Sequence, residues 1–269
     1  TELILGLPGE GYRSFLDGVE RILVERGNPV IYPLLLLNNT EFSRPEVRRQ
    51  HGLRTRWMPY QGFRDDAMAE VVYAHDLLSP DEWLRALCIR LTISVFHNAL
   101  LKKVLSGAHT HAGIPFTTLC EWLWDHISTR GIRSAGVLQA LFENYAESWK
   151  EYRAYDAELV EGVIGREGIR DHLHYQAILR VVLDDEATSR ALVQEMSDVV
   201  AARLVEEGIP LPGAWTTWIA EQHAIVRKIA RRMVDPDEGG FDTFLLAIYH
   251  GSVDTLGSGE AEAELRPVA

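Results

Sequence analysis

The chain has 269 residues and a formal net charge of −12, with 46% hydrophobic and 25% charged residues. This composition is typical of a globular protein, and the length fits one large domain or two modest ones. An acidic chain lacks the basic surface that nonspecific nucleic-acid binding needs, so we expect no nucleic-acid partner. No apolar run approaches the roughly 20 residues of a membrane span, so we also expect no membrane partner.

The first 42 residues predict a strand, a helix and a second strand. Residues 3–7 and 30–37 are almost continuously apolar, which is typical of parallel strands that are covered on both faces. Between them apolar residues recur at helical spacing, and Gly27 and Pro29 then break the chain. Two parallel strands joined by a helix form a crossover whose strand edges need neighbours. We therefore expect further strands upstream of Thr1 or from another chain.

Residues 43–78 are predicted to be a connecting segment. The pattern indicates a short helix over 45–51, a loop through 57–62 and a strand over 69–74. Six arginines crowd this part of an otherwise acidic chain, which favours a local anion site or a seam between domains. The alternative is a solvated charged face. The six are Arg44, Arg48, Arg49, Arg54, Arg56 and Arg64.

Residues 79–256 are predicted to form a helical domain. Ser79 can cap a helix, Pro80 suits the first helical position, and Glu82 completes a capping box. We expect this helix to run to Leu105 and to stop at Gly107. Further helices are expected over 117–130, 134–163, 170–183, 187–207 and 214–234, followed by a short apolar run over 241–249 and a disordered tail over 257–269.

The cysteines and paired histidines give no metal motif. Cys88 and Cys120 lie in apolar runs, which indicates buried thiols in a reducing compartment and hence a cytoplasmic location. His109 and His111 fall in a Gly-containing stretch that we interpret as a loop, without a third ligand nearby. We expect no metal ligand in this chain.

A family resemblance is carried by the first forty residues. Residues 2–10 (ELILGLPGE) resemble a late barrel strand and the following loop of radical S-adenosylmethionine (SAM) enzymes, and residues 31–40 (IYPLLLLNNT) resemble the next strand. The region after Ser79 looks most like members that also carry an N-terminal cobalamin-binding domain. The likeness is close over 1–42 and looser to about 105. It implies an α/β fold, the last strands of a partial parallel β/α barrel, followed by a mostly α-helical domain.

The resemblance also implies cofactors. Glu2 matches a position that approaches the SAM ribose, Ile4 one that packs on the adenine, and Leu34 one whose backbone reads the adenine edge. A 4Fe-4S cluster is implied, but its CxxxCxxC motif is missing, so its ligands are expected in an upstream part of the same enzyme. Cobalamin is implied for the members with the extra domain. Gly11 departs from the family, where Thr is frequent.

The expected function is therefore that of the C-terminal portion of a radical SAM enzyme acting on a small-molecule or peptide substrate. It would form a 5′-deoxyadenosyl radical, or transfer a methyl group with cobalamin. Candidate proton or hydrogen donors are Tyr60, Tyr73 and His75 near the domain joint, where pockets commonly form, and His97 on an apolar helix face. The alternative is a non-catalytic helical module with a small sheet that binds a ligand or a protein.

Overall fold

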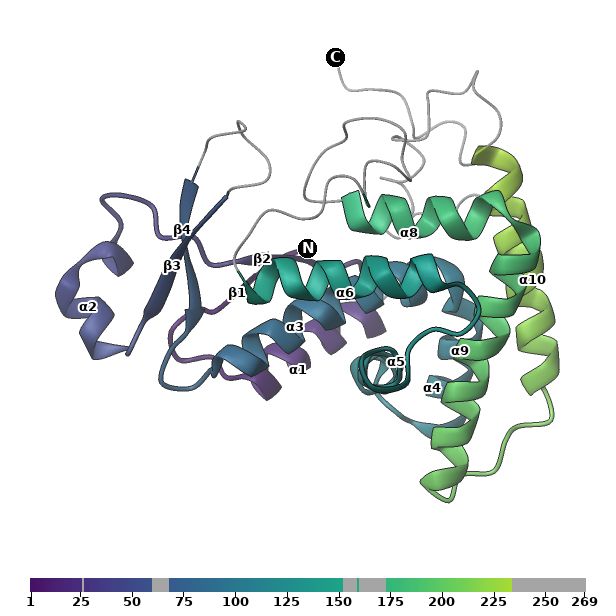
Figure 1. The fold of residues 1–269 in the computed structure, drawn as a ribbon. Coiled ribbons are helices and arrows are strands. Elements are labelled where there is room, and N and C mark those ends of the chain that lie inside the picture. Colours follow the sequence, from purple (N-terminus) through teal and green to yellow (C-terminus); the bar gives the residue numbers. More distant parts are fainter. Residues whose placement is uncertain (26, 60–67, 152–158, 160–172, 234–269) are drawn as a thin grey trace, which may run out of the picture.

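The computed structural model describes residues 1–25, 27–59, 68–151, 159 and 173–233. In this part the chain is mostly helical, with two small sheets. Figure 1 shows the second sheet and α2 at one end of the molecule and α9 and α10 at the other. In chain order the elements are β1 Glu2–Leu5, α1 Tyr12–Val24, β2 Val30–Pro33, the 3-10 helix η1 Glu41–Ser43, α2 Pro45–Gln50, β3 Arg54–Pro59, β4 Met68–Ala74, α3 Pro80–Thr92, the π-helix η2 Ile93–Leu100, α4 Lys102–Ala112, α5 Phe116–Arg130, α6 Gly136–Lys150, α8 Leu173–Asp184, α9 Glu186–Glu206 and α10 Trp215–Met233.

The predicted strand–helix–strand unit is confirmed. Strands β1 and β2 pair in parallel, with Ile4 opposite Tyr32. Leu5 and Ile31 are buried in the same core as the apolar face of α1. One face of these strands is open within this chain, where Ile4 is 42% and Tyr32 36% exposed, so the expectation that both faces are covered stays a prediction. The partial barrel implied by the resemblance, and the domain boundaries at 42 and 78, remain predictions.

The connecting segment contains a hairpin rather than a single strand. Residues 57–59 of the expected loop through 57–62 are the end of β3, which pairs antiparallel with β4, and residues 60–62 lie outside the described residues. Beyond β2 the chain joins this hairpin, since the Val72 N–H donates to the Leu34 carbonyl and the Leu36 N–H to the Glu70 carbonyl. The two small sheets are thus linked through residues 34–36.

The long helix expected over 80–105 is broken. The capping box at Ser79 is present, but α3 passes into η2, and Leu101 (φ −132°) separates η2 from α4. The fully buried Gln222 bridges the break: the Lys103 N–H donates to its Oε1 (2.7 Å), and its Nε2 donates to the Ala99 carbonyl (3.1 Å). This side chain satisfies two backbone groups that the break would otherwise leave without a helical partner.

Two other expectations for this region are wrong, because α4 continues to Ala112. Gly107 does not stop a helix but lies inside α4, where the Trp218 ring of α10 occupies the space of a side chain. His109 and His111 are helical residues of α4 rather than loop residues. Gly113, with φ +68°, is the residue that ends the helix.

The remaining expected helices are found as α5, α6, α8, α9 and α10, but the helix expected over 134–163 already ends at Lys150. Residue 241 onward, the tail and most of 151–172 lie outside the described residues. Within the described ranges no single helix is long and apolar enough to cross a membrane. Only the bent pair Pro80–Leu100 and Lys102–Ala112, at 99° to each other, passes that test when taken together.

A buried polar network fastens α1 to the helical region. The Tyr12 hydroxyl donates to Glu121 Oε1 (2.7 Å), and Arg85 Nε donates to the same hydroxyl (3.1 Å) and to Glu121 (3.3 Å). Glu20 of α1 also accepts hydrogen bonds from the first backbone N–H groups of α5, at Phe116 and Thr117. Because these groups come from α1, α3 and α5, they fix how the strand–helix–strand unit sits on the helices.

Candidate functional site

The open face of the first sheet holds two of the three residues expected to contact SAM. Glu2 and Ile4 are two positions apart on β1, so both side chains lie on one face, and both are exposed. Tyr32 extends this face from β2. The result is a small apolar platform with a carboxylate beside it, which suits a flat ring and its hydroxyl-bearing sugar.

Leu34, the third residue, has different surroundings. Its side chain is buried with Leu36 and Val72. Its N–H donates to the Leu5 carbonyl (2.8 Å), and its carbonyl accepts from the Val72 N–H (2.9 Å). A carbonyl oxygen has two lone pairs, so Leu34 retains one acceptor position for a ligand, while its N–H is already used.

The loop after β1 is shaped by two glycines. Gly6 and Gly9 have φ values of +98° and +91°, a region that glycine adopts without strain. The loop closes through a hydrogen bond from the Glu10 N–H to the Leu7 carbonyl (3.2 Å). Burial raises the pKa of Glu10, while nearby Arg21 acts in the opposite direction. The GLPGE stretch is therefore a defined turn at the carboxyl end of β1, where ligands of parallel sheets bind.

The candidate proton donors lie in different surroundings. His75 follows β4 and is buried, and its Nδ1 accepts from the Leu77 N–H (3.2 Å). Burial lowers its pKa, which keeps the ring neutral at pH 7. His97 is buried on η2, with Nδ1 2.9 Å from Asn98 Oδ1 and its ring edge-on to Phe116. Tyr73 lines a surface cleft. Tyr60 lies outside the described residues.

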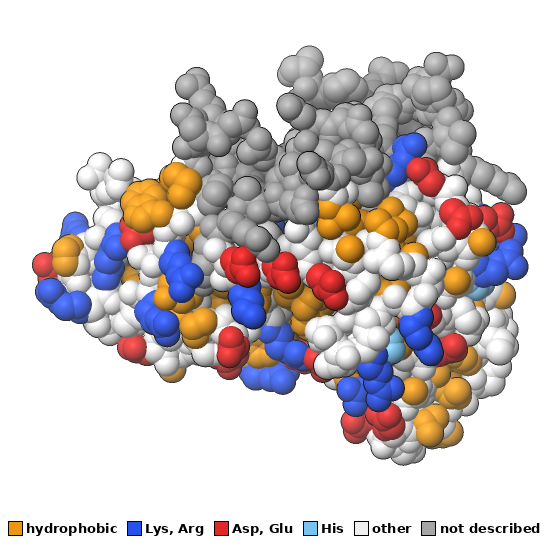
Figure 2. Space-filling model, in the orientation of Figure 1, with side chains coloured by type: hydrophobic (Ala, Val, Ile, Leu, Met, Phe, Trp, Pro, Cys, Tyr) orange, Lys and Arg blue, Asp and Glu red, His pale blue; other side chains and the backbone are white. Residues whose placement is uncertain are grey.

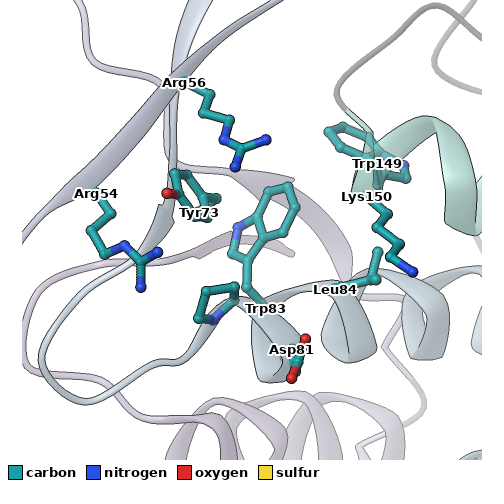
Figure 3. A pocket seen from close by; sticks show the side chains of 9 residues that line it. Arg54, Arg56, Tyr73, Asp81, Trp83, Leu84, Trp149 and Lys150 are labelled. Atoms are coloured by element: carbon teal, nitrogen blue, oxygen red, sulfur yellow. The ribbon is translucent and has the colours of Figure 1, made fainter.

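This cleft, of about 210 Å³, lies between the hairpin and the helices α3 and α6. Figure 3 shows its lining, with the Trp83 indole between Tyr73 and its two arginines on one side and Trp149 on the other. Arg54 and Arg56 both stand over the Tyr73 ring, at 5.2 and 5.0 Å from its centroid. The lining residues are Arg54, Arg56, Tyr73, Pro80, Asp81, Trp83, Leu84, Trp149 and Lys150.

Three arginines of the connecting segment have side chains in two different settings. Arg48 makes a bidentate ion pair with Glu70 (2.6 and 2.8 Å), and this hydrogen bonding raises the pKa of Arg48 and lowers that of Glu70. Arg54 and Arg56 instead line the cleft. Figure 2 shows blue side chains gathered over the end of the molecule that carries α2 and the hairpin. Arg64 lies outside the described residues.

Sequence reasoning missed the cleft because it expected a loop through 57–62, where the structure has the end of β3 at residues 57–59. One signal for strand β3 was available in the sequence. Arg54, Arg56 and Met58 are two positions apart from one another, which is the period of a strand.

Metal ligands are not gathered anywhere in the described ranges, where no group of three or more His, Cys, Asp or Glu could hold an ion. Cys88 and Cys120 are free and buried, and burial raises the pKa of both thiols. These residues do not fit an iron–sulfur cluster, which binds thiolates.

Comparison with known proteins finds similarity to two methyltransferases, one of which is named as a radical SAM enzyme. The chain is 32% identical over 161 residues to the cobalamin-dependent radical SAM methyltransferase TokK of Streptomyces tokunonensis, covering 55% of this chain and 24% of that protein. It is 30% identical over 162 residues to 2-(S-pantetheinyl)-carbapenam-3-carboxylate methyltransferase of Streptantibioticus cattleyicolor, covering 56% and 23%. The chain spans about a quarter of the length of these curated relatives. No protein-family model matches it.

Proposed function

We propose that this chain is the C-terminal part of a cobalamin-dependent radical SAM methyltransferase. The observation that carries the proposal is its similarity, at 30–32% identity over about 55% of the chain, to methyltransferases of which one is described as cobalamin-dependent and radical SAM. The resemblance of residues 2–10 and 31–40 to strands of such enzymes also supports it. In this proposal β1 and β2 are the last strands of a partial parallel β/α barrel.

The open face of β1 and β2 is the proposed contact with SAM. Glu2 accepts hydrogen bonds from the ribose hydroxyls, and Ile4 packs on the adenine. The free lone pair of the Leu34 carbonyl accepts from the adenine amino group. The exposure of Glu2 and Ile4 on one face supports this assignment. When bound, SAM and its partner cofactors supply the radical and methyl chemistry, and this chain's residues orient the nucleoside and exclude water.

The other cofactors are proposed to be held elsewhere. The described residues do not fit a 4Fe-4S cluster, so its ligands would come from another part of the complete protein. Cobalamin is proposed from the family resemblance and from the relative that is named as cobalamin-dependent. The substrate is a small molecule or a peptide, bound on the side of the helical domain, with Tyr60, Tyr73, His75 and His97 as candidate donors.

Binding of SAM to the complete, anaerobically reconstituted protein tests the proposal. We expect a brown, iron-containing protein that binds SAM, measured by calorimetry. Glu2→Gln should weaken that binding about tenfold, because charge-assisted hydrogen bonds to the ribose are lost. Glu25→Gln, at an exposed position that follows α1, is the matched control and should change nothing.

A colourless, iron-free protein that does not bind SAM would overturn the proposal and leave the alternative, a helical ligand- or protein-binding module. Normal SAM binding by Glu2→Gln would contradict only the proposed contact between Glu2 and the ribose, and would leave the rest of the proposal standing.

A further inference from the structure

The lining of the cleft beside Tyr73 is positively charged, although the chain as a whole is acidic. The lining has three cationic side chains, Arg54, Arg56 and Lys150, against one carboxylate, Asp81. The chain as a whole has a net charge of −12. A local positive field in an acidic protein attracts small anions and raises their concentration at the site.

A β-bulge in the hairpin places the Tyr73 ring against the guanidinium groups of Arg54 and Arg56 before any ligand binds. Arg54 pairs with Ala74 and Thr55 with Val72, so Tyr73 is the extra residue of a β-bulge. Bulges re-aim a side chain and are frequent next to binding sites. Here the Tyr73 ring lies under both Arg54 and Arg56. Stacking on one ring orders both side chains, which lowers the entropy that a ligand must overcome to bind them.

The opposite wall of the cleft is aromatic. The Trp83 and Trp149 rings meet edge to face, with centroids 5.7 Å apart and planes at 78°. Trp149 is in turn edge-on to Tyr145, at 6.4 Å, so its position is supported from behind. Indole faces also attract cations, but the adjacent arginines repel a cationic ligand. The chemistry of the two walls together favours a molecule with an anionic end next to a flat or apolar part.

We propose that this cleft binds the anionic end, a carboxylate or a phosphate, of a small molecule whose neighbouring apolar part packs on Trp149, which the buried Trp83 supports. Arginine forks bind the oxygens of either group in pairs. The volume of about 210 Å³ is below the roughly 300 Å³ at which pockets enclose a whole drug-sized ligand, so the cleft takes one end of a larger molecule. The assignment of that molecule as the substrate would rest on the proposed function. The anion site itself does not depend on it.

Titration of the complete protein with simple probes tests the site, without SAM and without reductant. The probes are benzoate, phenyl phosphate and the neutral benzyl alcohol, with binding measured by calorimetry and by tryptophan fluorescence. We expect benzoate or phenyl phosphate to bind at least about tenfold more tightly than benzyl alcohol, and added salt to weaken the difference. Tighter binding of benzoate identifies a carboxylate site, and tighter binding of phenyl phosphate a phosphate site.

Variants connect this binding to the cleft. Arg54→Gln and Arg56→Gln change exposed side chains and should each weaken anion binding about tenfold. Arg54→Lys keeps the charge but not the fork, and should recover part of the loss. Arg49→Gln removes an exposed arginine of α2, outside the cleft, and is the matched control.

Equal binding of the anionic and neutral probes would overturn the proposal. So would a loss in Arg49→Gln as large as in Arg54→Gln, since the effect would then be general electrostatics. Because no cofactor is present in the titration, either result leaves the proposed function untouched, and a failure to bind SAM leaves the anion site untouched.

Discussion

His174 shows at the scale of one residue how packing sets a charge. It lies on α8, is 5% exposed, and its Nε2 donates to Asn144 Oδ1 (2.8 Å). The Tyr145 ring stands edge-on to it, with ring centroids 5.3 Å apart. Burial lowers the pKa of His174 from the ordinary 6.5 to about 4, so the folded protein holds it neutral at pH 7.

This shift predicts an acid-sensitive stability. Below pH 6.5 the unfolded chain binds a proton at His174, whereas the folded protein binds it only near pH 4. The free energy of unfolding therefore falls as pH drops through that window, by about 2 kcal/mol between pH 7 and pH 5. In urea titrations at these two pH values, His174→Gln should show a pH dependence smaller by about that amount.

Carboxylates also titrate in this range, so only the difference between variant and parent is informative. His111→Gln, at an exposed residue of α4, serves as the control and should keep the parent's pH dependence. An unchanged pH dependence in His174→Gln would show that this histidine is protonated as easily in the folded protein as in the unfolded chain.

At the scale of elements, the sequence predicted what depends on neighbours in the chain. The start of α3 follows from Ser79, Pro80 and Glu82, and the structure has both hydrogen bonds of the capping box. The break at Leu101 has no local signal, since neither Pro nor Gly stands there. It depends on Gln222, 119 positions away from the Lys103 it contacts. Strand β3 was missed likewise, because it is a strand only when paired with β4.

Gly107 and Gly18 give a matched test of packing between elements. Both lie inside helices, where replacing Gly by Ala usually stabilises by up to about 1 kcal/mol. A Cβ on Gly18 meets nothing within 4 Å, whereas one on Gly107 would lie 2.4 Å from the Trp218 ring. We expect Gly18→Ala to raise the free energy of unfolding by roughly 0.5–1 kcal/mol and Gly107→Ala to lower it by about 1–3 kcal/mol, measured in urea.

Equal effects of the two substitutions would mean that α10 does not rest on α4 at Gly107. Trp218→Leu in the Gly107→Ala background separates the cause further. If overpacking is the reason, the smaller side chain should restore part of the lost stability.

At the scale of the whole molecule, the candidate site was only partly predictable. Glu2 and Ile4 sit on the predicted strand, and alternation alone places them on one face. The cleft was not predictable, because it needs the bulge at Tyr73 and the approach of Trp149 from α6, some 75 residues further along the chain. Both are products of tertiary pairing, and no local pattern encodes them.

The network around Glu121 makes a last prediction about the molecule as one unit. Glu121 has an 8% exposed side chain and receives hydrogen bonds from Tyr12 and Arg85, while Arg85 also reaches Asp125 (2.6 Å). Burial, followed by the hydrogen bond to Glu121, raises the pKa of Tyr12, so its hydroxyl keeps its proton as a donor at any physiological pH. Breaking such a buried pair from one side leaves polar groups without partners, which costs about 2–4 kcal/mol.

Because this network spans α1, α3 and α5, the strand–helix–strand unit and the helices should unfold together. We expect these two parts to unfold in the same transition by calorimetry and by circular dichroism, and a coupling of about 1 kcal/mol in the double-mutant cycle of Tyr12→Phe with Glu121→Gln. Ser14→Ala, on the exposed side of α1, replaces Tyr12→Phe as the control and should show no coupling to Glu121. Two separate transitions in the parent protein would mean that the first unit is stabilised independently, and the open face of β1 and β2 would then be free to move relative to the cleft.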